Sequence, residues 1–142
     1  MDPREFHALA SRLASGPGPA EFRSAISRSY YGAFNVGADT LRDLGFPVGK
    51  GAAAHGEVQK CLWNAGDTAV AAAASQLDDL HSRRNRADYR LDRADAESAI
   101  NARAAVDIAG QTIETIDRRF SSTQRAQLQA TIQQWRRANG YP

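Results

Sequence analysis

The spacing of apolar residues between positions 20 and 44 constrains the fold most strongly. Apolar side chains, among them Ile26, Phe34 and Leu41, recur there at intervals of three and four. An α-helix with about 3.6 residues per turn places such positions on one face, whereas a strand needs strict alternation. Gly45 follows the last apolar position and is typical of a helix end. We therefore predict a long helix over residues 20–44 with one buried face.

The same helical spacing continues through the rest of the chain. No run of residues alternates between apolar and polar side chains as a half-buried strand would, and β-branched residues are scattered. Short segments that contain Gly, Pro, Ser or Asp separate the apolar runs and mark helix ends. We therefore predict an all-α protein, with further helices over residues 2–14, 54–65, 68–88, 96–120 and 123–138.

Small residues interrupt the apolar face of the helix over residues 20–44. Gly32 and Gly37 lie near its middle, where they reduce the side-chain volume at some cost in helix propensity. We predict that another helix approaches closely at this point.

The start and the core face of the fifth helix can also be predicted. Asp95 precedes the apolar run, and a short carboxylate at that position caps the free N–H groups of a first turn. Ile100, Ile108 and Ile116 recur at helical spacing and are expected to face the core.

The terminal segment, residues 121–142, differs from the rest. Its apolar stripe of Leu128, Ile132 and Trp135 is narrow, and most other positions are Gln or Arg. Such a stripe suits packing on a surface groove or on a second subunit. A chain of 142 residues is long enough for one domain with a core and short for two. We predict one helical domain over residues 1–120, with the terminal helix packed on it or on a second subunit.

Several classes of protein are excluded or disfavoured. The single Cys61 has no partner for a disulfide, and no set of residues has metal-ligand spacing, so we predict neither a metal nor a cofactor. No apolar run has the length of a bilayer span, and residues 1–13 do not resemble a signal peptide. We expect a cytoplasmic protein without membrane contact. Nearly all cations are Arg, which suits phosphate, although codon bias would produce the same preference.

Residues 77–89, LDDLHSRRNRADY, concentrate the groups that could do chemistry. In a helix, Leu77 and Leu80 face the core, while His81, Arg84 and Asp88 fall on neighbouring positions of an adjoining face. Arg84 and Asp88 are four residues apart and can form an ion pair along the helix. That pair is either part of an anion-binding site or a salt bridge that fixes the helix end.

Five arginines gather near the end of this segment, and they are the best sequence evidence for contact with RNA. Clustered cations favour the approach of a polyanion. Asp residues are interleaved with them, and a solvated charged surface is the alternative interpretation. The five are Arg83, Arg84, Arg86, Arg90 and Arg93.

Two distant segments resemble a known family pattern. Residues 23–34, RSAISRSYYGAF, and residues 80–89, LHSRRNRADY, together resemble the HEPN domain (higher eukaryotes and prokaryotes nucleotide-binding), particularly its small stand-alone prokaryotic members. Residues 55–58 resemble the start of the family's intervening helix, and residues 95–104 resemble the capped helix that follows. The resemblance covers residues 22–120.

The resemblance implies a fold, a class of activity and partners. The implied fold is an antiparallel up-and-down bundle of four to five helices, here with a C-terminal amphipathic helix added, and the implied assembly is a homodimer. Many family members are metal-independent endoribonucleases or relics of them, often the toxin of a toxin-antitoxin pair, and a phage-defence module is a related context. Others act beside a minimal nucleotidyltransferase. A nucleotidyltransferase or an antitoxin is therefore the implied protein partner.

The resemblance also implies roles for individual residues. In active members an Arg stabilises the transition state, and a His four to six residues later transfers protons. Arg84 matches the Arg, but Tyr89 stands where that His is expected, and no His occurs after residue 81. A phenol with a pKa near ~10 is a poor base at neutral pH. Tyr89 or His81 is the candidate for proton transfer, and a non-catalytic module that binds RNA or a partner protein is the alternative.

The remaining candidates for contact with RNA or a nucleotide come from both segments. They are Arg28, Tyr31, Arg83, Asn85, Arg86 and Asp88. Arg28 has an alternative role in a salt bridge with Asp88 or Asp78. The resemblance implies a cleft near Arg84 and Asn85, and we expect the helix that carries the two tyrosines to line it. Tyr30 and Tyr31 are adjacent, so we expect one in the core and the other in this cleft. His55 is interpreted as a helix-start residue and His7 as a surface residue.

Overall fold

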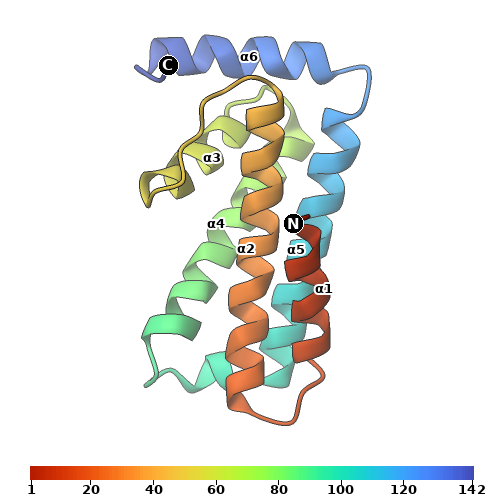
Figure 1. Cartoon of the computed structure of the whole chain (residues 1–142), viewed down its shortest axis with the longest axis vertical. Helices are drawn as coiled ribbons and strands as arrows, with labels where there is room; N and C mark the ends of the chain where they lie inside the picture. The colour runs from red at the N-terminus through yellow and green to blue at the C-terminus, as the bar shows by residue number, and fades with distance from the viewer.

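The computed structural model describes all 142 residues, and its regular structure is entirely helical (Figure 1). The prediction of an all-α protein is confirmed. The helices predicted over residues 20–44 and 68–88 agree with α2 and α4 to within one residue at each end. None of the helices combines the length and the apolar character that a bilayer span requires. The elements are α1 (Arg4–Leu13), α2 (Pro19–Asp43), α3 (Ala53–Trp63), α4 (Thr68–Tyr89), the 3₁₀ turn η1 (Ala94–Glu97), α5 (Ala99–Phe120) and α6 (Arg125–Ala138).

The end of α2 shows why the chain turns where the sequence predicts. Gly45 has φ of 95°, a left-handed conformation that glycine adopts without steric cost. Its N–H donates to the carbonyl of Arg42 at 2.9 Å, and the N–H of Phe46 donates to the carbonyl of Leu41 at 3.0 Å. These two hydrogen bonds form a Schellman motif, which satisfies carbonyls that the helix end would leave free.

The start of α5 differs from the prediction. Ser98, not Asp95, is the N-cap, and its hydroxyl accepts a hydrogen bond from the N–H of Asn101 at 3.3 Å. Asp95 lies in η1, and this extra turn delays the helix by three residues. Ile100 is 80% exposed, because it lies on the side of α5 opposite the buried positions 102, 105, 109, 113 and 116, so its assignment to the core is wrong. Ile108 is only half-buried, because small residues such as Ala105 form the buried face instead.

The long helix α2 lies at the centre of the molecule and packs against α1, α4 and α5. Figure 1 shows α2, α4 and α5 along the long axis, with α6 crossing one end. A Cβ atom on Gly37 would lie 3.1 Å from Val58 of α3, and one on Gly32 would lie 3.2 Å from the backbone of His7 in α1. The predicted close approach at the small residues of α2 is therefore present on two sides.

The terminal helix α6 packs on α3 and α5 of the same chain. Leu128 and Ile132 of its predicted stripe are buried. Arg136 is 1% exposed and donates to the carboxylate of Glu57 in α3 at 2.6 Å. An ion pair this deeply buried needs such close partners, because desolvation of the charges is costly. The guanidinium thus fixes α6 against α3.

Candidate functional site

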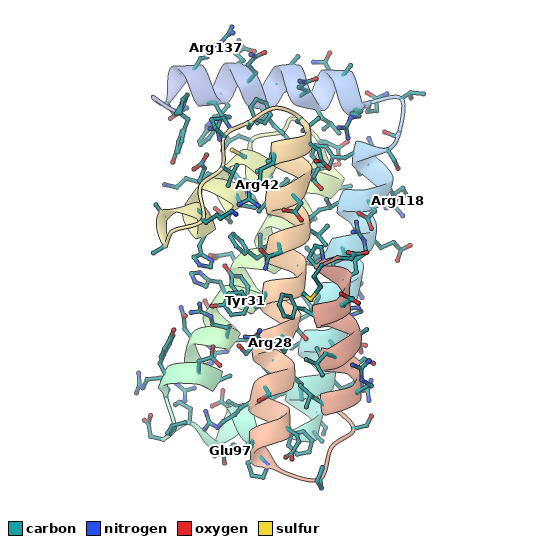
Figure 2. All side chains as sticks on the ribbon, in the orientation of Figure 1. Arg28, Tyr31, Arg42, Glu97, Arg118 and Arg137 are labelled. Atoms are coloured by element: carbon teal, nitrogen blue, oxygen red, sulfur yellow. The ribbon has the colours of Figure 1, made fainter.

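The two segments that carry the predicted site residues meet between α2 and α4. Arg84 donates a short hydrogen bond from Nη2 to the hydroxyl of Tyr31. Its guanidinium carbon lies 5.0 Å from the ring centroid of Tyr31 and 5.6 Å from that of Tyr30. Tyr30 is buried and Tyr31 is half-buried, as expected for adjacent residues with one in the core. Figure 2 shows Tyr31 about midway along α2.

The guanidinium of Arg84 is buried but has few strong partners. It is 7% exposed, and its Nη1 donates to the Asn85 side-chain oxygen at 2.7 Å. The predicted ion pair with Asp88 is present at 3.5 Å from Nε, which makes no hydrogen bond although it is buried. The carboxylate of Asp88 also accepts a hydrogen bond from the hydroxyl of Ser27 at 2.9 Å. Two neutral oxygens and one distant carboxylate therefore surround a buried cation.

Arg28 forms no ion pair, so the predicted salt bridge with Asp88 or Asp78 is wrong. Its guanidinium carbon instead lies 4.8 Å from the ring centroid of Tyr31 and 5.1 Å from that of Phe6. The carboxylate of Asp88 pairs with Arg84 and accepts a hydrogen bond from Ser27 instead. Arg28 therefore keeps a positive charge that no carboxylate neutralises.

Two histidines join this site, and only one was predicted. The ring of His81 stacks on the ring of Tyr30, with centroids 4.9 Å apart, and on the ring of His55 at 5.2 Å. Nδ1 of His55 forms a short hydrogen bond with the hydroxyl of Tyr30. His55 comes from α3, and sequence spacing gives no measure of how α3 sits against α4. The helix-start interpretation of His55 therefore missed its position in the site.

The pKa of each histidine is lowered. For His55 the main cause is burial, followed by the neighbouring charges of His81 and Arg84. For His81 burial again acts most strongly, and Arg84 lowers the pKa further while Asp78 raises it. Both rings are consequently neutral at pH 7.

Tyr89 lies at the outer edge of the site. Its side chain is 69% exposed, and its ring centroid is 5.4 Å from the guanidinium carbon of Arg84. The phenol is thus placed to contact a ligand from the solvent side, whereas His81 lies on the inner side.

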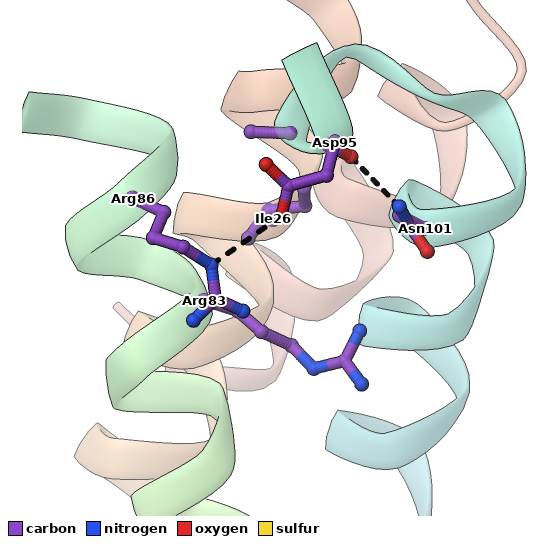
Figure 3. A pocket seen from close by; sticks show the side chains of 6 residues that line it. Ile26, Arg83, Arg86, Asp95 and Asn101 are labelled. Atoms are coloured by element: carbon purple, nitrogen blue, oxygen red, sulfur yellow. Dashed lines mark hydrogen bonds and ion pairs between the residues drawn. The ribbon is translucent and has the colours of Figure 1, made fainter. Parts of the chain in front are cut away.

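Arg83 and Arg86 are not part of this arrangement, although both were predicted as RNA contacts. They line a separate cavity of about 190 Å³ between α4, η1 and α5. Figure 3 shows the guanidinium of Arg83 extending toward α5 and the contact of Arg86 with Asp95, at 3.5 Å. Arg83 also pairs with Asp79 at 2.8 Å. Helical rotation places consecutive residues of α4 on different faces, which divides the predicted cluster.

The outermost arginines of the cluster are also paired with acids. Arg90 pairs with Asp92 and Arg93 pairs with Asp95, each at 3.2 Å. These four side chains are exposed. The interpretation as a solvated, largely neutralised surface fits them better than a concentrated positive patch.

Arg23 holds the end of α4 in place, a role that the sequence did not assign. Its buried guanidinium donates to the carbonyls of Ala87 and Arg93, both at 2.9 Å, and to Glu97 at 3.0 Å. Weaker donations reach three further carbonyls between α4 and η1. A planar group with five N–H donors suits several acceptors at once. The first Arg of the RSAISRSYYGAF segment thus positions the segment that carries Tyr89.

Comparisons with protein-family models, curated proteins and solved structures give no match for this chain. No group of three or more His, Cys, Asp or Glu side chains is arranged to hold a metal ion.

The site between α2, α3 and α4 combines a buried guanidinium, an unpaired cation, phenols and two neutral imidazoles. Such a set can bind an anion and exchange protons.

Proposed function

We propose that this chain is a HEPN-like domain that binds RNA or a nucleotide through a phosphate group beside Arg84 and Tyr31. The observation that carries the proposal is the buried Nε–H of Arg84, which has no hydrogen-bond partner. Burial of an unsatisfied charged donor is costly, and a phosphate oxygen supplies the missing acceptor. The planar guanidinium also matches phosphate geometry with two parallel donors.

Access to Arg84 requires one local change. The Asp88 side chain is 30% exposed and stands 3.5 Å from Nε, so a phosphate that displaces it breaks this ion pair and the hydrogen bond from Ser27. Arg28 adds a second cation, since no carboxylate pairs with it and its guanidinium covers the ring of Tyr31. A phosphate between these two arginines exchanges a weak internal ion pair for charge-assisted hydrogen bonds.

The finer parts of the proposal follow the resemblance to the HEPN family. They are an antiparallel up-and-down arrangement of four to five helices with α6 added, a homodimer, and a place in a cytoplasmic toxin-antitoxin or phage-defence module. A nucleotidyltransferase or an antitoxin is the proposed protein partner. The order of the motif segments along the chain supports these proposals, as does their meeting at Arg84 and Tyr31.

Binding to a partner protein without catalysis is a second candidate function. The observation that favours it is the exposure of three large apolar side chains, in the last turn of α4, in the connection after it and in the first turn of α5. Leu91 is 76% exposed, and Tyr89 and Ile100 are also exposed. An exposed apolar patch is a common feature of contact sites between proteins, and these three side chains are the candidates for one in this chain.

Fluorescence anisotropy with a labelled single-stranded RNA of mixed sequence, and separately with labelled ATP, tests the phosphate site. We expect Arg84→Gln to weaken the binding of RNA about tenfold, the loss of roughly one charged hydrogen bond. Arg12→Gln is the matched control, because Arg12 is an exposed arginine of α1 with no ion pair. The proposal is wrong if wild-type protein binds neither probe, or if both variants weaken binding equally while helical content is unchanged.

A further inference from the structure

A cavity of about 190 Å³ lies between α4, η1 and α5, apart from the site around Arg84. Arg83 and Arg86 line it, and their three-residue spacing places both side chains on one side of α4. Arg84 is rotated by about 100° around the helix axis from Arg83 and faces the tyrosines of α2 instead. The two arginines of this cavity therefore do not contribute to the site at Arg84.

Both arginines of the cavity keep N–H donors that the chain itself does not use. Arg83 donates from Nε to Asp79 at 2.8 Å, and Nε of Arg86 lies 3.5 Å from the carboxylate of Asp95. The Nη1 and Nη2 nitrogens of both side chains form no hydrogen bond within the chain. Figure 3 shows the guanidinium of Arg83 extending across the cavity toward α5. An oxyanion in the cavity can therefore accept hydrogen bonds from both guanidinium groups.

The walls of the cavity are fixed to one another before any ligand arrives. Arg23 donates to the carbonyl of Ala87 in α4 at 2.9 Å and to the carboxylate of Glu97 in η1 at 3.0 Å. Nδ2 of Asn101 in α5 donates to the Asp95 carbonyl of η1 at 2.8 Å. Hydrogen bonds thus join α4 to η1 and η1 to α5. A ligand that enters a preformed cavity loses less free energy to the ordering of the protein.

The size and the charges of the cavity favour a small anion over a nucleic-acid strand. A cavity of about 150 Å³ can hold a benzene molecule, so about 190 Å³ accommodates a phosphate group with a small substituent. The exposed carboxylate of Asp79 stands beside Arg83, and that of Asp95 stands beside Arg86. These carboxylates repel a polyanion that passes along the surface. Asp95 also pairs with Arg93 at 3.2 Å, so it keeps a partner when the Nη nitrogens of Arg86 bind a ligand.

Three other lining residues indicate what the substituent carries. The side-chain oxygen of Asn101 accepts no hydrogen bond within the chain, because the amide uses only its Nδ2. An amide oxygen is an acceptor for a ligand hydroxyl. Ile26 and Ala96 form the apolar part of the wall, which suits the carbon atoms of the same ligand. A compact molecule with a phosphate, a hydroxyl and a carbon skeleton matches these groups.

We propose that the cavity between α4, η1 and α5 binds a small sugar phosphate, with Arg83 and Arg86 holding the phosphate and Asn101 accepting from a hydroxyl. A phosphate monoester near neutral pH carries close to two negative charges and three terminal oxygens, so it engages both guanidinium groups at once. A carboxylate has a single charge, which one guanidinium satisfies. The site takes a ligand independently of RNA binding at Arg84.

Isothermal titration calorimetry with ribose 5-phosphate, and separately with inorganic phosphate, tests the cavity at constant ionic strength. We expect Arg83→Gln and Arg86→Gln each to weaken the binding of ribose 5-phosphate about tenfold or more, the loss of roughly one charged hydrogen bond. Arg12→Gln is the matched control and should bind as the wild type does, because Arg12 is an exposed arginine of α1 with no ion pair. Ribose without a phosphate should give no binding signal.

The variant Arg84→Gln separates this cavity from the site at Arg84. Its affinity for ribose 5-phosphate should change less than about twofold, because the two sites share no side chain. Nuclear magnetic resonance of the wild-type protein provides a test that needs no variant. The side-chain N–H resonances of Arg83 and Arg86 should shift during titration with ribose 5-phosphate, whereas those of Arg84 should not.

The outcomes distinguish this proposal from the proposed function. Wild-type protein that binds neither probe at about 10 mM overturns the sugar-phosphate site. Binding that is lost in Arg84→Gln but kept in Arg83→Gln overturns it as well, and so does ribose 5-phosphate that binds no more tightly than inorganic phosphate. If RNA does not bind while ribose 5-phosphate binds in an Arg83-dependent manner, the proposed function is wrong and this site stands.

Discussion

Arg84 and Tyr31 form a hydrogen bond between residues that are 53 positions apart in the sequence. This contact joins the middle of α2 to the second half of α4, and it holds the guanidinium beside two phenol rings. Because the guanidinium is buried, its orientation depends on the acceptors around it more than on its own torsional preferences.

Tyr31→Phe is expected to destabilise the protein. The substitution keeps the ring but removes the acceptor of the Arg84 Nη2 hydrogen bond, which leaves a buried charged donor without a partner. We expect a loss of about 1–3 kcal/mol in the free energy of unfolding, measured by urea denaturation. Tyr141→Phe is the control, because the Tyr141 hydroxyl forms no hydrogen bond within the chain. Equal stability of the two variants would show that the Arg84–Tyr31 bond contributes nothing.

Arg23→Gln is expected to release the end of α4. Its guanidinium holds carbonyls at Ala87 and Arg93, and one amide cannot reach both. Loss of a buried, multiply bonded cation costs about 3 kcal/mol. Hydrogen exchange should show faster exchange over residues 87–98 than in the wild type. In α5 beyond residue 105 we expect no preferential change, and uniform acceleration throughout the chain would contradict the proposed local role.

Asp67 provides a pH-dependent contribution to stability. Its carboxylate caps α4 by accepting from the N–H of Val70 at 3.0 Å and pairs with Arg119 at 2.5 Å. Burial raises the pKa of Asp67, but these hydrogen bonds and the charge of Arg119 lower it more. The pKa of Asp67 in the folded protein therefore lies below its ordinary value of 3.8.

A lowered folded-state pKa means that the unfolded chain binds the proton first as the pH falls. The stabilisation is therefore fully present well above pH 3.8 and is lost as the pH falls below that value. We expect Asp67→Asn to reduce the unfolding free energy by about 1–2 kcal/mol at pH 7. The difference from wild type should shrink toward pH 2 in denaturation series. A difference that grows at low pH would contradict the assignment.

Gly37→Ala and Gly56→Ala should change stability in opposite directions. A methyl group at Gly37 would lie 3.1 Å from Val58 and 3.4 Å from Leu62, both fully buried. We expect a loss of about 1 kcal/mol or more from this overpacking. At Gly56 the space is open, so the better helix propensity of alanine should add about 0.5–1 kcal/mol. Thermal denaturation measures both, and stabilisation by Gly37→Ala would show that α2 and α3 can separate.

Local sequence patterns predicted most of the helices because the spacing of apolar residues and the turn glycines are local properties. Gly45 marked the end of α2 correctly, but Asp95 did not mark the start of α5, since a four-residue 3₁₀ turn intervenes before Ser98. Ile100 was assigned to the wrong face, because the buried stripe of α5 runs through small residues such as Ala102, Ala105 and Ala109 on the opposite side of the helix.

The site could be predicted only in part. Arg84 and Tyr31 were expected to share a cleft, and they are in contact. His55, by contrast, joins the site through the placement of α3, and no spacing within the chain encodes that placement. Arg28 was expected to form an ion pair, but its position over two aromatic rings depends on α1, which supplies Phe6.

The buried pair of Arg136 and Glu57 gives α6 an influence that its surface position conceals. Glu57 is two residues after His55 on the short helix α3. The helix that carries the His55 imidazole is therefore also the helix that Arg136 of α6 binds. Detaching α6 would leave the Glu57 carboxylate without its partner and would loosen α3, which carries His55. Mutations in α6, far from Arg84, should therefore change the position of His55 relative to His81.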